Sequence, residues 1–127
     1  MTTGRLSPTP DATAPDGSEI RLAGQVRGGS MVHCTLPPGQ TTQAVRHRTV
    51  EELWLVTGGR GEVWRQPEGG AGEVTPVQAG TWLTIPLGVR FQFRNVGVEP
   101  LTIVIATLPP WPGPDEAVAV ENHWPRR

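Results

Sequence analysis

The chain has 127 residues and carries 11 Lys and Arg against 12 Asp and Glu, which gives a formal net charge of −1. This length supports one domain with a modest core, and the near-neutral charge excludes a strong field that would favour nucleic acid or an anionic membrane surface. Its 16 Gly and 14 Pro indicate many short strands joined by tight turns, and its single cysteine, Cys34, excludes an intrachain disulfide.

The first 18 residues are rich in Thr, Pro, Ala and Asp and show no apolar period, so we expect residues 1–18 to form a flexible tail. They lack the apolar region of a secretory signal. No apolar run in the chain approaches the roughly 20 residues of a membrane-spanning helix. We therefore expect a cytoplasmic protein without a membrane partner.

Apolar and β-branched runs then alternate with Gly and Pro turns at intervals of roughly 8–12 residues, which is typical of an all-β sandwich or barrel. The expected strands are 19–24, 30–36, 41–47, 52–58, 62–66, 73–78, 81–86, 89–95 and 100–108. Residues 109–127 begin with a Pro-rich stretch that disfavours a helix. We expect them to form an extension that packs on the barrel or on a partner subunit.

Two groups of residues stand at fixed spacings. The first group is Gly39, Val45, His47, Glu52 and Gly59, and the second is Gly80, Pro86, Gly88, Phe91 and Asn95. Their spacings resemble the two motifs of the cupin superfamily, in which His stands at the positions of Val45, His47 and Phe91. The resemblance covers about residues 30–108. It implies a cupin-type double-stranded β-helix, or jelly-roll barrel, over residues 19–108, and a homodimer, because cupins of this size are often dimers.

In metal-binding cupins the three His and the Glu of these motifs converge on a divalent ion. This chain keeps His47 and Glu52, but Val45 and Phe91 offer no lone pair. Two protein ligands are fewer than the usual three plus water, so the resemblance implies a degenerate metal site and no cofactor. Cys34 has the inward parity of its strand and could complete a Zn, Fe or Mn site with His47 and Glu52; its alternative role is a small buried hydrophobe.

His47 and Glu52 also have two interpretations. They could form a hydrogen-bonded polar pair left in a barrel without metal. They could instead act as a catalytic acid/base pair, because an apolar pocket raises the pKa of a Glu and a nearby His exchanges protons.

The strand alternation predicts a mostly apolar ligand pocket inside the barrel. Its predicted lining is Val32, Cys34, Val45, Trp54, Phe91, Phe93, Ile103 and Ile105, with Arg90 at the rim to meet an anionic group. The opposite interpretation is that Phe91 and Phe93 plug the interior. Trp64 and Trp82 are expected to pack between the barrel and a partner subunit, and Trp111 is expected over a barrel opening or a subunit seam.

Three functions follow from these patterns. The first is a cupin that binds a small, largely apolar or aromatic molecule and performs metal-independent isomerisation, cyclisation or elimination with His47 and Glu52. The second is a metal-dependent dioxygenase or isomerase that uses His47, Glu52 and Cys34 or water. The third is a ligand-binding cupin without catalysis. The fold does not decide among them, because one fold hosts many chemistries.

Overall fold

The computed structural model describes residues 1–127 as eleven β-strands without any helix. The strands are β1 (Ala12–Thr13), β2 (Glu19–Val26), β3 (Gly29–Leu36), β4 (Val45–His47), β5 (Glu51–Gly58), β6 (Arg60–Gln66), β7 (Glu73–Gln78), β8 (Trp82–Ile85), β9 (Arg90–Asn95), β10 (Leu101–Leu108) and β11 (Ala117–Ala119). No helix long and apolar enough to cross a membrane is present.

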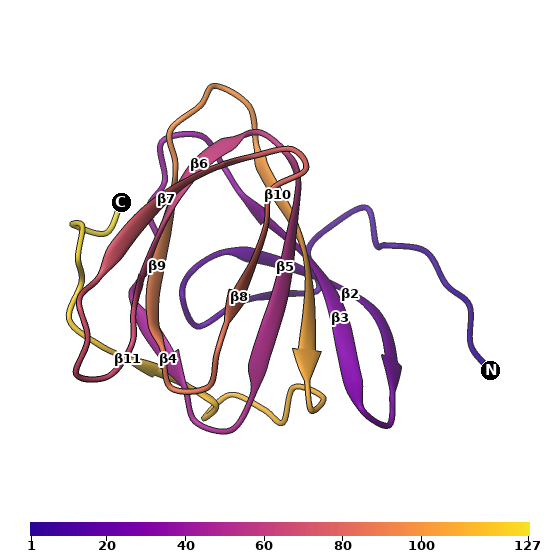
Figure 1. Ribbon diagram of the computed structural model, residues 1–127. Coiled ribbons are helices and arrows are strands. Elements are labelled where there is room, and N and C mark those ends of the chain that lie inside the picture. Colours follow the sequence, from indigo (N-terminus) through magenta and orange to yellow (C-terminus); the bar gives the residue numbers. More distant parts are fainter.

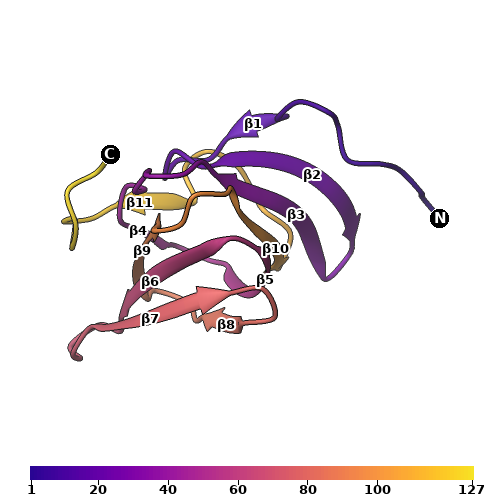
Figure 2. The same cartoon turned by 90° about the horizontal axis from the view of Figure 1, so that it is seen from above.

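The strands form two antiparallel sheets that face each other (Figures 1 and 2). One sheet has six strands in the order β1-β2-β3-β10-β5-β8, and the other has five in the order β11-β4-β9-β6-β7. This arrangement confirms the predicted all-β jelly-roll barrel. The β2–β3 hairpin extends sideways from the rest of the barrel (Figure 2).

Strict alternation along β5 and β10 builds the inner face of the six-stranded sheet. On β5, Glu52, Trp54 and Val56 are buried, while their neighbours in the strand are exposed. Antiparallel pairing brings Ile105 of β10 opposite Trp54 and Ile103 opposite Val56. Because side chains alternate between the two faces of a strand, this register gathers one continuous apolar surface inside the barrel.

A packed cluster of 14 buried hydrophobic residues fills part of the space between the sheets. Phe93 belongs to this cluster and has no exposed surface, and its ring meets that of Trp54 edge to face with 5.1 Å between centroids. Closely packed protein interiors leave few voids. Phe93 therefore fills this part of the barrel.

Two residues of the motif frame have clear structural roles. Gly59 has φ of +79°, and a side chain there would collide with the backbone of Pro100 and Leu101. Asn95 donates from Nδ2 to the carbonyl oxygens of Leu36 (2.9 Å) and Glu99 (2.8 Å). Asn95 thereby ties the end of β3 to the turn between β9 and β10.

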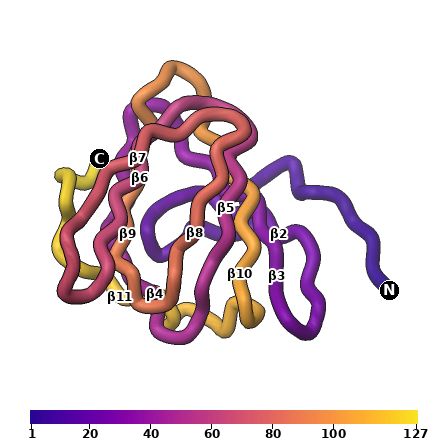
Figure 3. Tube along the Cα trace, viewed as in Figure 1, coloured from indigo at the N-terminus to yellow at the C-terminus, as the bar shows by residue number.

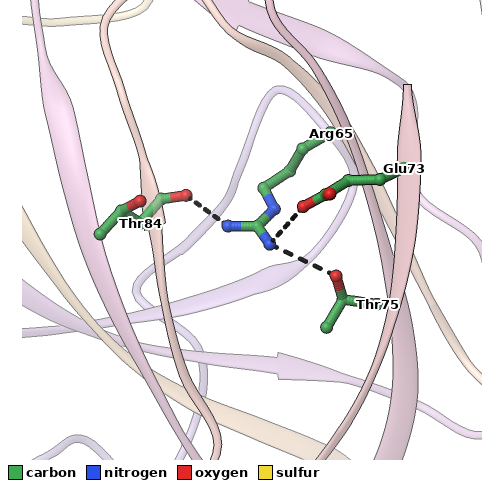
Figure 4. Close-up of polar contacts among 4 residues, drawn as sticks. All are labelled: Arg65, Glu73, Thr75 and Thr84. Atoms are coloured by element: carbon green, nitrogen blue, oxygen red, sulfur yellow. Dashed lines mark hydrogen bonds and ion pairs between the residues drawn. The ribbon is translucent and has the colours of Figure 1, made fainter. Parts of the chain in front are cut away.

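Arg65 on β6 links the two sheets (Figure 4). Its guanidinium donates to the carbonyl oxygen of Thr84 on β8 at 3.0 Å, and to Glu73 (3.1 Å) and Thr75 (3.3 Å) on β7. Because β8 belongs to the six-stranded sheet and β6 and β7 to the other, this single side chain joins the sheets at one edge.

The part of the N-terminal segment that packs on the barrel begins earlier in the chain than the sequence predicts. The sequence predicts a flexible tail over residues 1–18, whereas β1 at Ala12–Thr13 pairs with β2, and Asp16 and Ser18 are buried. Asp16 Oδ1 accepts hydrogen bonds from the Ser18 amide (2.9 Å) and hydroxyl (2.7 Å). A hydrogen bond from the amide two residues further on to an Asp side chain defines an Asx-turn. Such a turn orders this segment although it has no apolar periodicity.

The C-terminal segment 109–127 packs on its own barrel and runs beside the five-stranded sheet (Figure 3). Gln92 on β9 holds it: Nε2 donates to the carbonyl oxygens of Thr42 (2.7 Å) and Trp124 (2.8 Å), and Oε1 accepts from the amides of His123 (2.9 Å) and Trp124 (2.8 Å). The His123 ring also stacks on Trp64 at 5.1 Å. The C-terminal segment of the same chain therefore covers Trp64, where the sequence predicted a partner subunit.

Candidate functional site

A cavity of about 620 Å³ opens where the barrel interior meets the segment before β2, the β2–β3 hairpin and the first part of the C-terminal segment. It is lined by His47, Glu52, Val32, Val45, Trp54, Phe91 and Ile105 from the predicted set. The turn before β2 adds Asp16, and the C-terminal segment adds Trp111. Mostly apolar cavities with a few converging polar groups are the usual form of a small-molecule site.

Four residues of the predicted pocket lie elsewhere. Cys34, Phe93 and Ile103 belong to the packed cluster and do not line the cavity. Strand parity gives the face on which a side chain lies but not its depth along the barrel axis, so these inward residues became core. Arg90 borders a separate surface pocket with Trp64 and Gln66, so it does not form the rim of this cavity.

Glu52 faces this cavity from β5 with 8% of its surface exposed. Its Oε1 accepts a 3.0 Å hydrogen bond from the Trp54 indole, and its Oε2 accepts a 2.9 Å bond from the Thr107 hydroxyl. Burial raises the pKa of Glu52 to about 7, the two hydrogen bonds oppose that rise, and the charges of Asp16 and Glu116 add to it. A carboxyl with this pKa exists in both protonation states near neutral pH.

His47 lies at the end of β4 with 5% of its surface exposed. Its ring stands edge to face between Phe91 and Trp111, at 5.2 Å from each. Burial lowers the pKa of His47 to about 4, while the charge of Glu116 opposes that shift. His47 is therefore neutral at pH 7, and its buried Nδ1 has no hydrogen-bond partner.

The two side chains line one cavity but share no hydrogen bond, so the interpretation of His47 and Glu52 as a bonded pair is wrong. They stand on strands of different sheets. The oxygens of Glu52 are instead bonded to Trp54 and Thr107. Each group therefore faces the cavity independently.

Asp16 is a cavity residue that sequence reasoning missed. Its carboxyl is buried, and its backbone oxygen accepts a 2.8 Å bond from the Gln43 amide. Burial raises the pKa of Asp16, while the bonds from Ser18 and the charge of Arg126 oppose the rise. The turn sequence Pro15-Asp16-Gly17-Ser18 was the available signal, since Asp followed by Gly marks an ordered turn.

The residues present do not fit a divalent metal centre. Val45 and Phe91 occupy two of the four ligand positions implied by the motifs and pair directly across β4 and β9. No group of three or more His, Cys, Asp or Glu side chains is placed to hold an ion. Cys34 is not brought to His47 and Glu52 as a third ligand; burial raises its thiol pKa, which disfavours a thiolate.

Comparison with known proteins finds a family model that matches most of the barrel. The family model described as "Cupin domain" matches residues 32–107. No match was found among curated protein sequences.

Solved structures share the fold at low identity. CapF, the capsular polysaccharide assembling protein of Staphylococcus aureus, has TM-score 0.73 and 16% identity over 94% of this chain and 35% of its own. An uncharacterised conserved protein of Klebsiella pneumoniae with a double-stranded β-helix domain has TM-score 0.68 and 21% identity over 89% and 91%.

Bacillus subtilis oxalate decarboxylase, a protein with Mn(II) centres, has TM-score 0.71 and 17% identity over 88% of this chain and 30% of its own. These likenesses establish the fold alone, whereas the family model covers more than half of the residues. The chain therefore belongs to the cupin family.

Proposed function

We propose that this cupin binds a small, largely apolar or aromatic molecule in the cavity and exchanges protons with it through Glu52. The observation that carries the proposal is the position of Glu52: a buried carboxyl that faces an aromatic-lined cavity of about 620 Å³ and has no cationic partner. A general acid or base works best when its pKa lies near the working pH, which favours this group for proton transfer.

Glu52 would act as a single proton carrier. Its carboxylate takes a proton from one position of the ligand, and the resulting carboxylic acid returns that proton at another position, so the step balances without a co-reactant. Isomerisation needs nothing more. In a cyclisation the returned proton goes to another atom of the same ligand, and in an elimination it goes to the leaving group, which departs protonated. The Trp54 and Thr107 hydrogen bonds hold the carboxyl in place while it changes protonation state.

His47 would orient the ligand. A neutral imidazole has one donor and one acceptor nitrogen, and no protein group bonds to either nitrogen of His47. Its ring is fixed between Phe91 and Trp111, so a ligand finds these two polar atoms at a defined place. A ligand that bonds to Nδ1 removes the cost of an unpaired buried polar atom.

The homodimer is also a proposal. The outer face of the six-stranded sheet exposes Leu53, Leu55 and Trp82, with Leu55 opposite Trp82 in the register of β5 and β8. A contiguous apolar surface of this kind suits contact with a second copy of the chain. Light scattering of the wild type and of Trp82→Ser tests it, because a dimer held by this face becomes a monomer in the variant.

Hydrogen–deuterium exchange tests the proton transfer. We expect the protein to accelerate exchange of the acidic α-hydrogens of 4-phenylbutan-2-one in D₂O, followed by NMR. Glu52→Gln should abolish the acceleration, and Glu51→Gln, on the exposed face of the same strand, should keep it. Binding that shifts the indole resonances of Trp54 and Trp111 without any Glu52-dependent exchange would leave a ligand-binding cupin without catalysis.

A further inference from the structure

We infer that the ligand of this cavity is a small organic cation, such as a protonated arylalkylamine, held by the carboxylates of Asp16 and Glu52 beside the aromatic rings. The inference rests on the proposed function, because it names the ligand class of the same cavity.

The charges around the cavity have one sign. No Arg or Lys lines it, although the chain has 11 such residues, and its only two acidic side chains are Asp16 and Glu52. Both ion pairs of the chain lie elsewhere and involve residues of β6. Asp16 has only the charge of Arg126 near it, and no ion pair reaches Glu52. Buried carboxylates are costly without a paired counter-charge, so an ammonium group in the cavity adds the positive charge that Glu52 lacks.

Hydrogen-bond acceptors in the cavity also exceed the donors. Asp16 Oδ1 accepts two bonds from Ser18, but Oδ2 accepts none. Each oxygen of Glu52 accepts one bond, whereas a carboxylate offers about four acceptor sites. His47, with 5% of its surface exposed, adds one acceptor nitrogen and one N–H donor at the same cavity, and its buried Nδ1 has no partner. A primary ammonium has three N–H donors, which match this excess of acceptors.

Three aromatic rings, those of Trp54, Phe91 and Trp111, contribute to the apolar lining of the site. Trp54 and Phe91 meet edge to face at 5.6 Å, and Trp111 lies beyond His47. Ring faces attract cations through their quadrupole, and the attraction is strongest where water is excluded. An anionic ligand would instead meet two carboxyls and no positive charge within the cavity.

The inferred binding depends on pH in one direction. Asp16, Glu116, Cys34 and His47 are the titratable groups that surround Glu52 from the neighbouring segments. A cation favours the Glu52 carboxylate, so binding displaces its proton. Affinity should rise with pH up to the pKa of free Glu52, about 7, and level off above it.

Three probes of matched shape test the sign of the charge. Benzylamine, benzyl alcohol and benzoate are titrated into the full chain at pH 7.5 by calorimetry. We expect benzylamine to bind about tenfold more tightly than benzyl alcohol, and benzoate to bind least, given the typical strength of charge-assisted and cation–π contacts. Benzoate binding as tight as benzylamine binding would overturn the inference.

Charge-neutral variants locate the counter-charge. Asp16→Asn and Glu52→Gln should each weaken benzylamine several-fold and leave benzyl alcohol within about twofold, and Glu51→Gln should change neither. Thermal unfolding shows whether Asp16→Asn folds; if it does not, Glu52→Gln alone decides. Equal affinities for benzylamine and benzyl alcohol would contradict the cationic ligand class but would agree with the proposed binding of a small aromatic molecule. If none of the three probes binds, both proposals are contradicted.

Discussion

The indole of Trp54 donates a 3.0 Å hydrogen bond to the carboxyl of Glu52, its second neighbour along β5. Residues two apart on a strand share one face, so both side chains enter the barrel together. Thr107 of β10 holds the other oxygen at 2.9 Å. The site is therefore built around a carboxyl fixed by two neutral donors, and not around a His–Glu pair.

Trp54→Phe tests the role of that indole. The hydrogen bond lowers the pKa of Glu52, so its loss should raise this pKa above its present value of about 7. Removing a buried bond and part of a ring should also cost about 1–3 kcal/mol of unfolding free energy. Carboxyl ¹³C NMR measures the pKa of Glu52. Trp82 is 72% exposed, so the control variant Trp82→Phe should leave this pKa unchanged.

Glu52 should make the protein less stable as the pH rises from 4.5 through 7. Its pKa is about 7 in the folded chain against 4.5 for the free group, so the folded state binds more protons between these values. The contribution of Glu52 to the free energy of unfolding is fully present below pH 4.5 and is lost as the pH rises through 7. The loss is on the order of 3 kcal/mol. His47 acts oppositely: its pKa of about 4, below 6.5, costs stability as pH falls through that range.

Comparison of the wild type with Glu52→Gln separates the two groups. The stability of Glu52→Gln relative to wild type should increase from pH 4.5 to pH 8 in urea unfolding. A constant difference across this range would show that Glu52 titrates like an exposed carboxyl.

The metal site should be recoverable by two substitutions. Val45→His with Phe91→His restores both missing ligand positions beside His47 and Glu52, on strands that already pair at those residues. We expect the double variant to bind Zn²⁺ or Mn²⁺ at one ion per chain by calorimetry, and the wild type to bind neither stoichiometrically. A double variant that folds but binds no ion would show that the barrel lacks the geometry as well as the ligands.

Gln92 should control attachment of the C-terminal segment. Its amide is completely buried and bonds to Thr42, His123 and Trp124. Gln92→Leu keeps the size but leaves these partners unpaired, at a cost on the order of 2 kcal/mol. Amide exchange of residues 120–127 should accelerate in this variant and not in Gln78→Ala, whose exposed side chain makes no bond. Equal exchange in both variants would assign the attachment to other contacts.

Periodicity and motif spacing were sufficient to predict the barrel. Alternation along β5 and β10 places Trp54, Val56 and Ile105 on the inner face, and the frame residues Gly59 and Asn95 act at close approaches of the chain. These features are local, so a sequence can reveal them.

The site itself depends on distances across the barrel, which the sequence does not encode locally. The side chains of Cys34 and Ile103 lie on the inner face of the sheet, as predicted, but they belong to the packed core and do not line the cavity. Asp16 reaches the cavity through an Asx-turn in a polar segment without any apolar pattern. The partners of Glu52 follow from the packing of β5 against β10, which only the folded chain defines.

Carboxyl ¹³C NMR of Glu52 in the full chain, titrated with and without benzyl alcohol, tests the central claim most directly. The expected result is a pKa near 7 and a resonance that moves when the alcohol binds. A pKa near 4.5 together with a resonance that ignores the alcohol would contradict a buried proton-exchanging group at a ligand cavity.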